Sequence, residues 1–306
     1  KMHDSTYSLK ESRVLSEKAI LRIGQFSESP VLAVARALRL EKKYDIDWTT
    51  ERVPSSPSQF QSLQDGTIDI AITSPDNVLL YGTTDQNPIK KKLDLKFLRS
   101  IDRGLGLALY SSAAVSRAEE FRGTTIGVDV PNSGFAFLLF SMLSNLGVER
   151  VDYELEAVGA TPKRLAAITD GVVVATVLNA ETAIAAENAG LKKWSTSKDV
   201  SDNYLGTVLV QVGSSQTEQV HRFLDLWEDA TEAILSMPAE SLSRLLAIEN
   251  PRLADPNYIG LLQSHDYGIL RDSRVTSEQL LILADIRSQF GAYRPSDEAI
   301  SELLKN

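Results

Sequence analysis

The sequence predicts an α/β fold made of two similar lobes, and three observations lead to this prediction. Strand-like apolar runs alternate with capped, helix-like segments from about residue 20 to residue 212, as parallel βαβ units do. A helix–strand–helix pattern occurs twice, and its two copies lie 105 residues apart, from Pro57 to Pro162. From about residue 215 to the end the pattern is helical, so these helices must pack on a body already built.

The first copy of this repeated unit spans residues 56–77. Ser56 and the proline after it are typical of a helix start, and Gly66 is typical of a helix end. An apolar strand over residues 68–72 follows the glycine. Ser74, again followed by proline, opens the next helix.

The second copy spans residues 161–182 and repeats these signals, with a helix from Thr161 and a buried strand over residues 172–178. Any two α/β units share such start and stop residues, but the fixed spacing favours a duplication. The matching positions are Pro57 with Pro162, Asp65 with Asp170, Gly66 with Gly171, and Ser74 with Asn179.

The remaining elements place the lobe boundaries. We expect the chain to leave lobe 1 near residue 107, to build lobe 2, and to return near residue 207. Lobe 1 is therefore predicted to comprise residues 1–106 and 208–306, and lobe 2 residues 107–207; residues 1–18 are expected to form a tail or an amphipathic arm. Further strands are predicted over 21–26, 46–53, 95–101, 105–110, 125–130, 151–158 and 204–212, and C-terminal helices over 216–235, 239–248, 257–264, 277–290 and 296–304.

Composition excludes several classes of protein. The net charge of −9 and the pI near 5.0 argue against a nucleic-acid partner. The absence of cysteine excludes disulfides and thiolate chemistry, and no apolar run reaches the roughly 18 residues of a membrane span. The first 18 residues are polar and contain no signal peptide, so we expect either a mature exported chain or a cytosolic protein.

A family resemblance runs through residues 20–212. The chain resembles the type II periplasmic solute-binding proteins of ABC importers, in the branch that captures nitrate, taurine, alkanesulfonates and thiamine-pyrimidine precursors. The resemblance rests on Leu21-Arg-Ile-Gly24 with Ser29-Pro30, Leu63-Gln-Asp-Gly-Thr-Ile-Asp-Ile-Ala-Ile72, Phe121-Arg-Gly-Thr-Thr-Ile-Gly-Val128, Ser133-Gly134, and Asp170-Gly-Val-Val-Val-Ala-Thr-Val177.

This resemblance implies a doubly wound, mostly parallel sheet in each lobe, extra C-terminal helices on lobe 1, and a ligand held between the lobes. It implies an extracytoplasmic binding protein, periplasmic or lipid-anchored after loss of its signal sequence. This protein would capture a small organic solute, such as an aminopyrimidine or a sulfonate, by hinge closure. The partners would be that solute and a membrane permease, without nucleic acid, and the protein would be a monomer. No cofactor and no metal are expected.

Ligands of open α/β sheets bind beyond the carboxyl ends of the strands, where helix N-termini offer free N–H groups. Each serine could instead be only an N-cap, each aromatic ring only core, and each acid only a complement to a helix dipole. Acids that do face the cleft would favour a ligand with N–H or cationic groups, and Arg103 is the one cation placed nearby. The candidate ligand-binding residues are Phe26, Ser27, Glu28, Ser29, Ser74, Asp76, Asn77, Asp129, Asn132, Ser133, Gly134, Phe135, Asn179, Glu181 and Tyr204.

Two other functions remain as alternatives. Relatives on the same scaffold include a cysteine-dependent sulfinate desulfinase and a thiamine-pyrimidine synthase that uses its own histidine. Here Phe26-Ser27 follows the first strand, cysteine is absent, and the three histidines (His3, His221, His265) lie away from the predicted strand ends without metal-ligand spacing. We therefore expect no enzyme. The second alternative is a ligand-sensing module.

Overall fold

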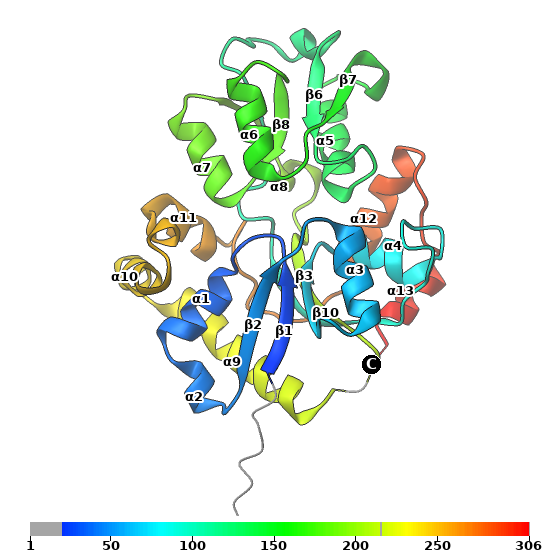
Figure 1. Ribbon diagram of the computed structural model, residues 1–306. Helices are drawn as coiled ribbons and strands as arrows, with labels where there is room; N and C mark the ends of the chain where they lie inside the picture. Colours follow the sequence, from blue (N-terminus) through cyan, green and yellow to red (C-terminus); the bar gives the residue numbers. More distant parts are fainter. Residues whose placement is uncertain (1–19, 215, 306) are drawn as a thin grey trace, which may run out of the picture.

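The computed structural model describes residues 20–214 and 216–305, so the predicted tail at residues 1–18 and His3 lie outside the described residues. Two five-stranded sheets form the framework (Figure 1). The first has the order β2-β1-β3-β10-β4, built from β1 (Ile20–Gln25), β2 (Asp47–Arg52), β3 (Ile70–Thr73), β4 (Leu95–Asp102) and β10 (Thr207–Val212). The second has the order β7-β6-β8-β5-β9, built from β5 (Ala108–Ser111), β6 (Thr125–Val128), β7 (Glu154–Ala157), β8 (Ala175–Leu178) and β9 (Lys192–Thr196).

The two sheets are wound alike, and the predicted two-lobed α/β fold is confirmed. Three strands of each sheet pair in parallel. In the first sheet β1 pairs with β2 and β3, and in the second β6 pairs with β7 and β8. The strand that arrives from the other lobe, β10 or β5, is antiparallel to both of its neighbours. We call the part that holds the first sheet lobe 1 and the part that holds the second sheet lobe 2.

Helices cover both sheets. The α-helices are α1 (Pro30–Ala37), α2 (Leu40–Lys43), α3 (Ser56–Asp65), α4 (Pro75–Thr83), α5 (Gly134–Asn145), α6 (Thr161–Thr169), α7 (Ala180–Asn188), α8 (Ser197–Val200), α9 (Glu218–Ser236), α10 (Ala239–Glu249), α11 (Pro256–Gln263), α12 (Ser277–Gln289) and α13 (Asp297–Leu303). The 3₁₀ helices are η1 (Ala118–Phe121), η2 (Arg150–Asp152) and η3 (Pro251–Ala254). Among the described residues no helix is long and apolar enough to cross a membrane.

The repeated unit forms twice, although the predicted buried strand over residues 172–178 is shortened to β8 (Ala175–Leu178), and Val172 is exposed. Helix α3, strand β3 and helix α4 in lobe 1 match α6, β8 and α7 in lobe 2, and β3 and β8 both take the central position of their sheet. Gly66 and Gly171 follow the first helix of each copy with φ of 71° and 75°, a left-handed backbone that glycine adopts without strain. One predicted N-cap is wrong: Ser55, not Ser56, accepts the hydrogen bond that caps α3.

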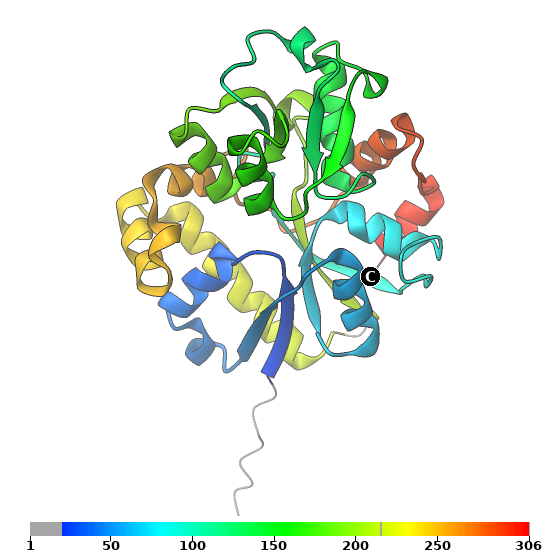
Figure 2. The same ribbon diagram turned by 45° about the horizontal axis from the view of Figure 1, so that its top comes forward.

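The C-terminal helices lie on lobe 1, as predicted, but two of them also contact lobe 2 (Figures 1 and 2). Helix α9 and α10 pack on α1, and α13 packs on α4, whereas α11 also contacts α7 and α12 also contacts α5. One hydrophobic cluster accordingly contains Val78 of α4, Leu139 of α5 and Leu280 of α12. The two lobes are therefore joined through a continuous apolar contact on the α12 side.

The crossings between the lobes pack closely around a buried carboxylate. Asp102, at the end of β4, accepts hydrogen bonds from the backbone N–H of Gly104 (2.7 Å) and from the hydroxyl of Thr207. Gly206 N–H donates to the carbonyl of Asp102 over 2.8 Å. A Cβ on Gly206 would lie only 2.6 Å from the nitrogen of Gly104, so the close approach of the two crossing segments requires glycine there.

Candidate functional site

The strand ends of the two lobes face each other. Strands β1 and β3 run toward the lobe junction from one side, and β6 and β8 run toward it from the other (Figure 1). Helices α4 and α5 begin at this junction, and a Cβ on Gly134 would lie 2.7 Å from the Cβ of Asp76. Gly134 in lobe 2 therefore contacts Asp76 in lobe 1 directly.

The end of β1 contributes four predicted residues, which are placed differently. Phe26 leaves 41% of its surface exposed, and Ser27 is also exposed. Glu28 accepts a hydrogen bond of 2.5 Å from the side-chain amide of Asn250. Ser29 is buried as the N-cap of α1, where its hydroxyl accepts from the N–H of Leu32 over 3.2 Å.

The end of β3 carries a buried ion pair. Ser74 caps α4 by accepting from the N–H of Asn77, whose side chain donates to the hydroxyl of Thr73. Asp76 in the first turn of α4 is 5% exposed and lies 2.8 Å from a guanidinium nitrogen of Arg287 on α12. Burial raises the pKa of Asp76 above its usual value, and Arg287 offsets part of that shift.

The end of β6 leads into the start of α5. The hydroxyl of Ser133 donates to the carboxylate of Asp129 and also accepts from the N–H of Ala136, so Ser133 is both N-cap and partner of an acid. Asn132 is exposed. Among the described residues, no acceptor is recorded for the first-turn N–H groups of Gly134 and Phe135.

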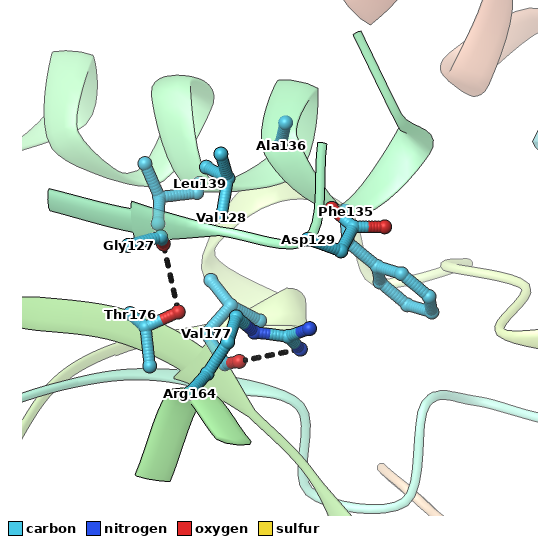
Figure 3. Close-up of a pocket in the computed structure, with 9 residues that line it drawn as sticks. All are labelled: Gly127, Val128, Asp129, Phe135, Ala136, Leu139, Arg164, Thr176 and Val177. Carbon is cyan, nitrogen blue, oxygen red and sulfur yellow. Dashed lines mark hydrogen bonds between the residues drawn. The ribbon is translucent and has the colours of Figure 1, made fainter. Parts of the chain in front are cut away.

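A narrow crevice lies between the ends of β6 and β8, and Figure 3 shows it. Phe135 projects beyond its rim, and the guanidinium of Arg164 on α6 is turned toward Asp129 and Phe135. Arg164 is 5% exposed and donates to the carbonyls of Gly159 (2.8 Å) and Val177 (3.1 Å). Burial lowers the pKa of Arg164 below its usual value, and the negative charge of Asp129 acts in the opposite direction.

The end of β8 and the return crossing hold the last three predicted residues. Asn179 makes no capping hydrogen bond; its side-chain amide instead donates to the carbonyl of Gly104 over 3.3 Å. Glu181 is exposed in the first turn of α7. Tyr204 is buried beside Gly104, where burial raises the pKa of its phenol and the charge of Asp76 adds to that shift.

Two pairs of carboxylates from opposite lobes influence each other. Asp129 in lobe 2 helps to raise the pKa of Asp76 in lobe 1. Surrounding protein atoms raise the pKa of Glu181 in lobe 2, and the charge of Glu28 in lobe 1 adds to this. Arg52 acts against the second shift, as does Arg252. Each side of the junction therefore combines acids from both lobes with arginines.

Sequence reasoning placed Arg103 near the cleft but missed the buried arginines Arg164 and Arg287. Arg287 lies 211 residues from Asp76 in the chain, and no local motif connects the two. Arg164 could have been found, because it lies 105 residues after Gln59 in the repeated unit. Among the described residues, no group of three or more His, Asp or Glu side chains is arranged to hold a metal ion.

Comparisons with known proteins identify the fold. No family model and no curated protein matches the sequence. Many solved structures resemble the chain, and three of them serve as examples. The alkanesulfonate-binding protein SsuA of Xanthomonas axonopodis pv. citri, bound to MOPS, is 16% identical with a TM-score of 0.70 over 94% of this chain and 95% of its own. The ligand-binding component of an ABC-type import system of Staphylococcus aureus, with zinc bound, is 14% identical with a TM-score of 0.74, over 94% of this chain and 96% of its own. A conserved Candida albicans gene product with the generic periplasmic-binding-protein fold is 15% identical with a TM-score of 0.71, over 94% of this chain and 94% of its own. These similarities show that the chain has the fold of the periplasmic binding proteins.

Proposed function

We propose that the protein is the extracytoplasmic solute-binding component of an ABC importer and that it acts as a monomer. It captures a small organic solute between its lobes and delivers the solute to a permease in the membrane. The observation that carries this proposal is the direct contact of Asp76 with Gly134, which brings the starting turns of α4 and α5 together across the lobe junction. The structural neighbours, which include sulfonate-binding and import-system proteins, support it.

The proposed capture is a hinge motion of the two lobes. The described part of lobe 1 (residues 20–106, 208–214 and 216–305) moves as one body against residues 107–207, and the crossings at Gly104 and Gly206 act as the hinge. Opening separates Gly134 from Asp76 and exposes the helix starts to solvent. A solute that bridges them stabilises the closed form by the free energy of its binding.

The predicted residues then divide into two roles. Phe26 and Phe135 offer partly exposed rings to an apolar portion of the solute, and the first turns of α4 and α5 offer N–H groups to its polar portion. Ser29, Ser74 and Ser133 hold the helix starts in place as N-caps.

Native mass spectrometry of the freshly purified protein tests the proposal, followed by thermal-shift measurements with pyrimidines, sulfonates, amines and aromatic acids. We expect either a co-purified small molecule or a rise in melting temperature with one class of solute. Turnover of a solute by the purified protein would instead favour an enzyme. A protein that carries no solute and responds to none of these classes would contradict the proposal.

A further inference from the structure

A groove lies on lobe 1 beside the end of β4 that is remote from the lobe junction. Lys96, Phe97 and Arg99 of β4 line this groove. The strand ends at Asp102 in the crossing between the lobes, so Lys96 lies about 20 Å from that crossing along the strand. The start of α9, which contributes His221, lies at the end of lobe 1 farthest from lobe 2 (Figure 1). The groove is therefore separate from the junction between the lobes.

The groove follows one edge of the first sheet. Strand β4 is the last strand of that sheet, and a C-terminal segment covers its second half, where the N–H of Ser100 donates to the carbonyl of Ser273 over 2.9 Å. The first half of the strand borders the groove, whose other walls include Val275 and Leu304. The volume is about 680 Å³, which lies in the range of small-molecule sites, so the groove can hold a small organic molecule.

The charged side chains of the groove all have one sign. Among the described residues that line it, Lys96, Arg99, Arg274 and Lys305 are basic, and none is an aspartate or a glutamate. In the whole chain, by contrast, 41 acidic residues outnumber 32 lysines and arginines. Four cations around one hollow raise its potential and attract an anion to it.

Three of these cations have carboxylate partners that do not line the groove. The pairs are Arg99 with Glu228 (2.6 Å), Arg274 with Asp272 (2.8 Å) and Lys305 with Glu302 (2.8 Å). The pairs of Arg274 and Lys305 are exposed to solvent. Exposed ion pairs contribute little to stability, so these two cations can turn to an anion in the groove at small cost.

Lys96 is the least satisfied of the four cations. Its side chain is 19% exposed, and one hydrogen bond is recorded for its ammonium group, to the carbonyl of Lys305 over 3.3 Å. The carboxylate of Asp94 is 3.8 Å away, beyond hydrogen-bond distance. Two of the three N–H donors of Lys96 therefore have no recorded acceptor among the described residues. An anion in the groove would supply acceptors to this largely buried ammonium group.

Apolar side chains line the same groove. Phe97, Val275 and Leu304 are each partly buried, and all three pack against the larger hydrophobic cluster. They leave part of their surface for a ligand. A molecule in the groove thus contacts both apolar side chains and cations, as ligands of small-molecule sites do.

We propose that this groove is a second binding site of the protein, for a soluble organic molecule that joins a doubly charged anionic group, such as a phosphate monoester, to an apolar portion. Lys96 and Arg99 bind the anionic group from β4, and Arg274 and Lys305 bind it from the rim. Phe97 contacts the apolar portion. The inference goes beyond the proposed function, because the groove belongs to lobe 1 alone.

The test uses three probes: phenyl phosphate, inorganic phosphate and phenol, each titrated into isotopically labelled protein at constant ionic strength. We expect phenyl phosphate to shift the amide NMR signals of Phe97 and Val275 and to bind about tenfold more tightly than inorganic phosphate. Phenol, which lacks the charge, should shift neither signal. Lys96→Gln should weaken the binding of phenyl phosphate about tenfold or more, because it removes a charge-assisted hydrogen bond.

Two further variants separate binding from folding. Arg274→Gln combined with Lys305→Gln removes two cations whose side chains are 82% and 69% exposed, so the fold should be unchanged while phenyl phosphate binds several-fold more weakly. Lys163→Gln removes the same charge from an exposed position of lobe 2 and should leave the NMR response unchanged.

The proposal is overturned if phenyl phosphate shifts neither amide signal, or if phenol shifts both as strongly. It is also overturned if Lys96→Gln and the double variant bind phenyl phosphate as the unmodified protein does. Its failure is distinguishable from failure of the proposed function. A protein that binds phenyl phosphate in the groove but captures no solute between its lobes would refute the proposed function and keep this second site.

Discussion

The two copies of the repeated unit share a backbone plan but differ in charge at the junction. In lobe 1 the strand end is tied by the neutral Gln59, and the acid of the following helix, Asp76, is neutralised by Arg287. In lobe 2 the tie is Arg164, and the equivalent acid is the exposed Glu181. The buried acid of the first copy is therefore paired with an arginine, whereas no ion pair within the described residues is recorded for Arg164 or Glu181 in the second.

The two copies also differ in how their second helix begins. Ser74 caps α4 within its own lobe, whereas Asn179 at the same place donates to Gly104 in the crossing segment. The N–H of Ala180 likewise donates to the carbonyl of Leu105. The start of α7 is thus fastened to the hinge. We therefore expect the second copy, rather than the first, to couple its lobe to the proposed hinge.

The largest expected effect is on stability, and it differs between variants of the two buried arginines. Arg287→Met leaves Asp76 buried without its partner and should lower the free energy of unfolding by about 3–5 kcal/mol. Arg164→Gln should change it by less than about 1 kcal/mol, because no close ion pair is lost. Urea unfolding of both variants measures the difference. Equal losses in the two variants would contradict the distinction between a neutralised and an uncompensated charge.

A single added methyl group at Gly134 should disrupt the contact between Gly134 and Asp76 across the lobe junction. Gly134→Ala places a Cβ 2.7 Å from the Cβ of Asp76, and such overpacking costs about 1–3 kcal/mol in the closed form only. Solute affinity should fall by roughly tenfold or more while the open protein stays folded. Isothermal titration with the solute found by mass spectrometry measures this.

Gly260→Ala is the matched control, since a Cβ there meets no atom within 4 Å. Its affinity should equal that of the unmodified protein. An unchanged affinity in Gly134→Ala would show that the contact is not part of the bound state.

Substitutions at the starts of α4 and α7 should change the stability of the protein by a smaller amount. Ser74→Ala removes a capping hydrogen bond and should destabilise the protein by about 1 kcal/mol. Asn179→Ala removes no capping bond and should cost less than about 0.5 kcal/mol, while loosening the start of α7. Thermal unfolding measures the first effect, and hydrogen exchange at Ala180 measures the second. A larger stability loss in Asn179→Ala than in Ser74→Ala would reverse the comparison.

The hinge should add a weak dependence on pH. Burial raises the pKa of Asp102 above its value in the unfolded chain. Between these two pKa values the folded form binds more protons, so this group adds stability as the pH falls through that window. Asp102→Asn keeps one acceptor oxygen for the N–H of Gly104 and places an amide donor opposite the hydroxyl of Thr207, which can accept from it. This variant should lack the pH-dependent contribution. Unfolding of both proteins between about pH 8 and about pH 4 tests the sign.

Local signals in the sequence predicted much of the fold. Ser29, Ser74 and Ser133 cap the helices as expected, and the fixed offset of the repeated unit recurs in β3 and β8. Strand β9 was missed because its lysines are exposed and its run is short, so it lacks the apolar alternation that marks a strand.

The candidate site was only partly predictable. Strand ends and helix starts follow from local patterns, and these identified Asp76, Asp129 and Gly134 as candidates. Arg287 could not be found, because it reaches Asp76 through the packing of α12, which no local pattern encodes. Arg164 was within reach of the duplication argument, since Gln59 marks its position in the other copy.

The most direct test of the account is the distance between the lobes with and without solute. The chain has no cysteine, so Val151→Cys on lobe 2 and Ile248→Cys on lobe 1 provide two labelling sites at side chains that are 92% and 70% exposed. Pulsed electron paramagnetic resonance on spin labels at these sites reports the distance distribution. The account predicts a broad distribution that becomes shorter and narrower when the solute binds. An identical distribution with and without a bound solute would contradict closure of two lobes as the mechanism of capture.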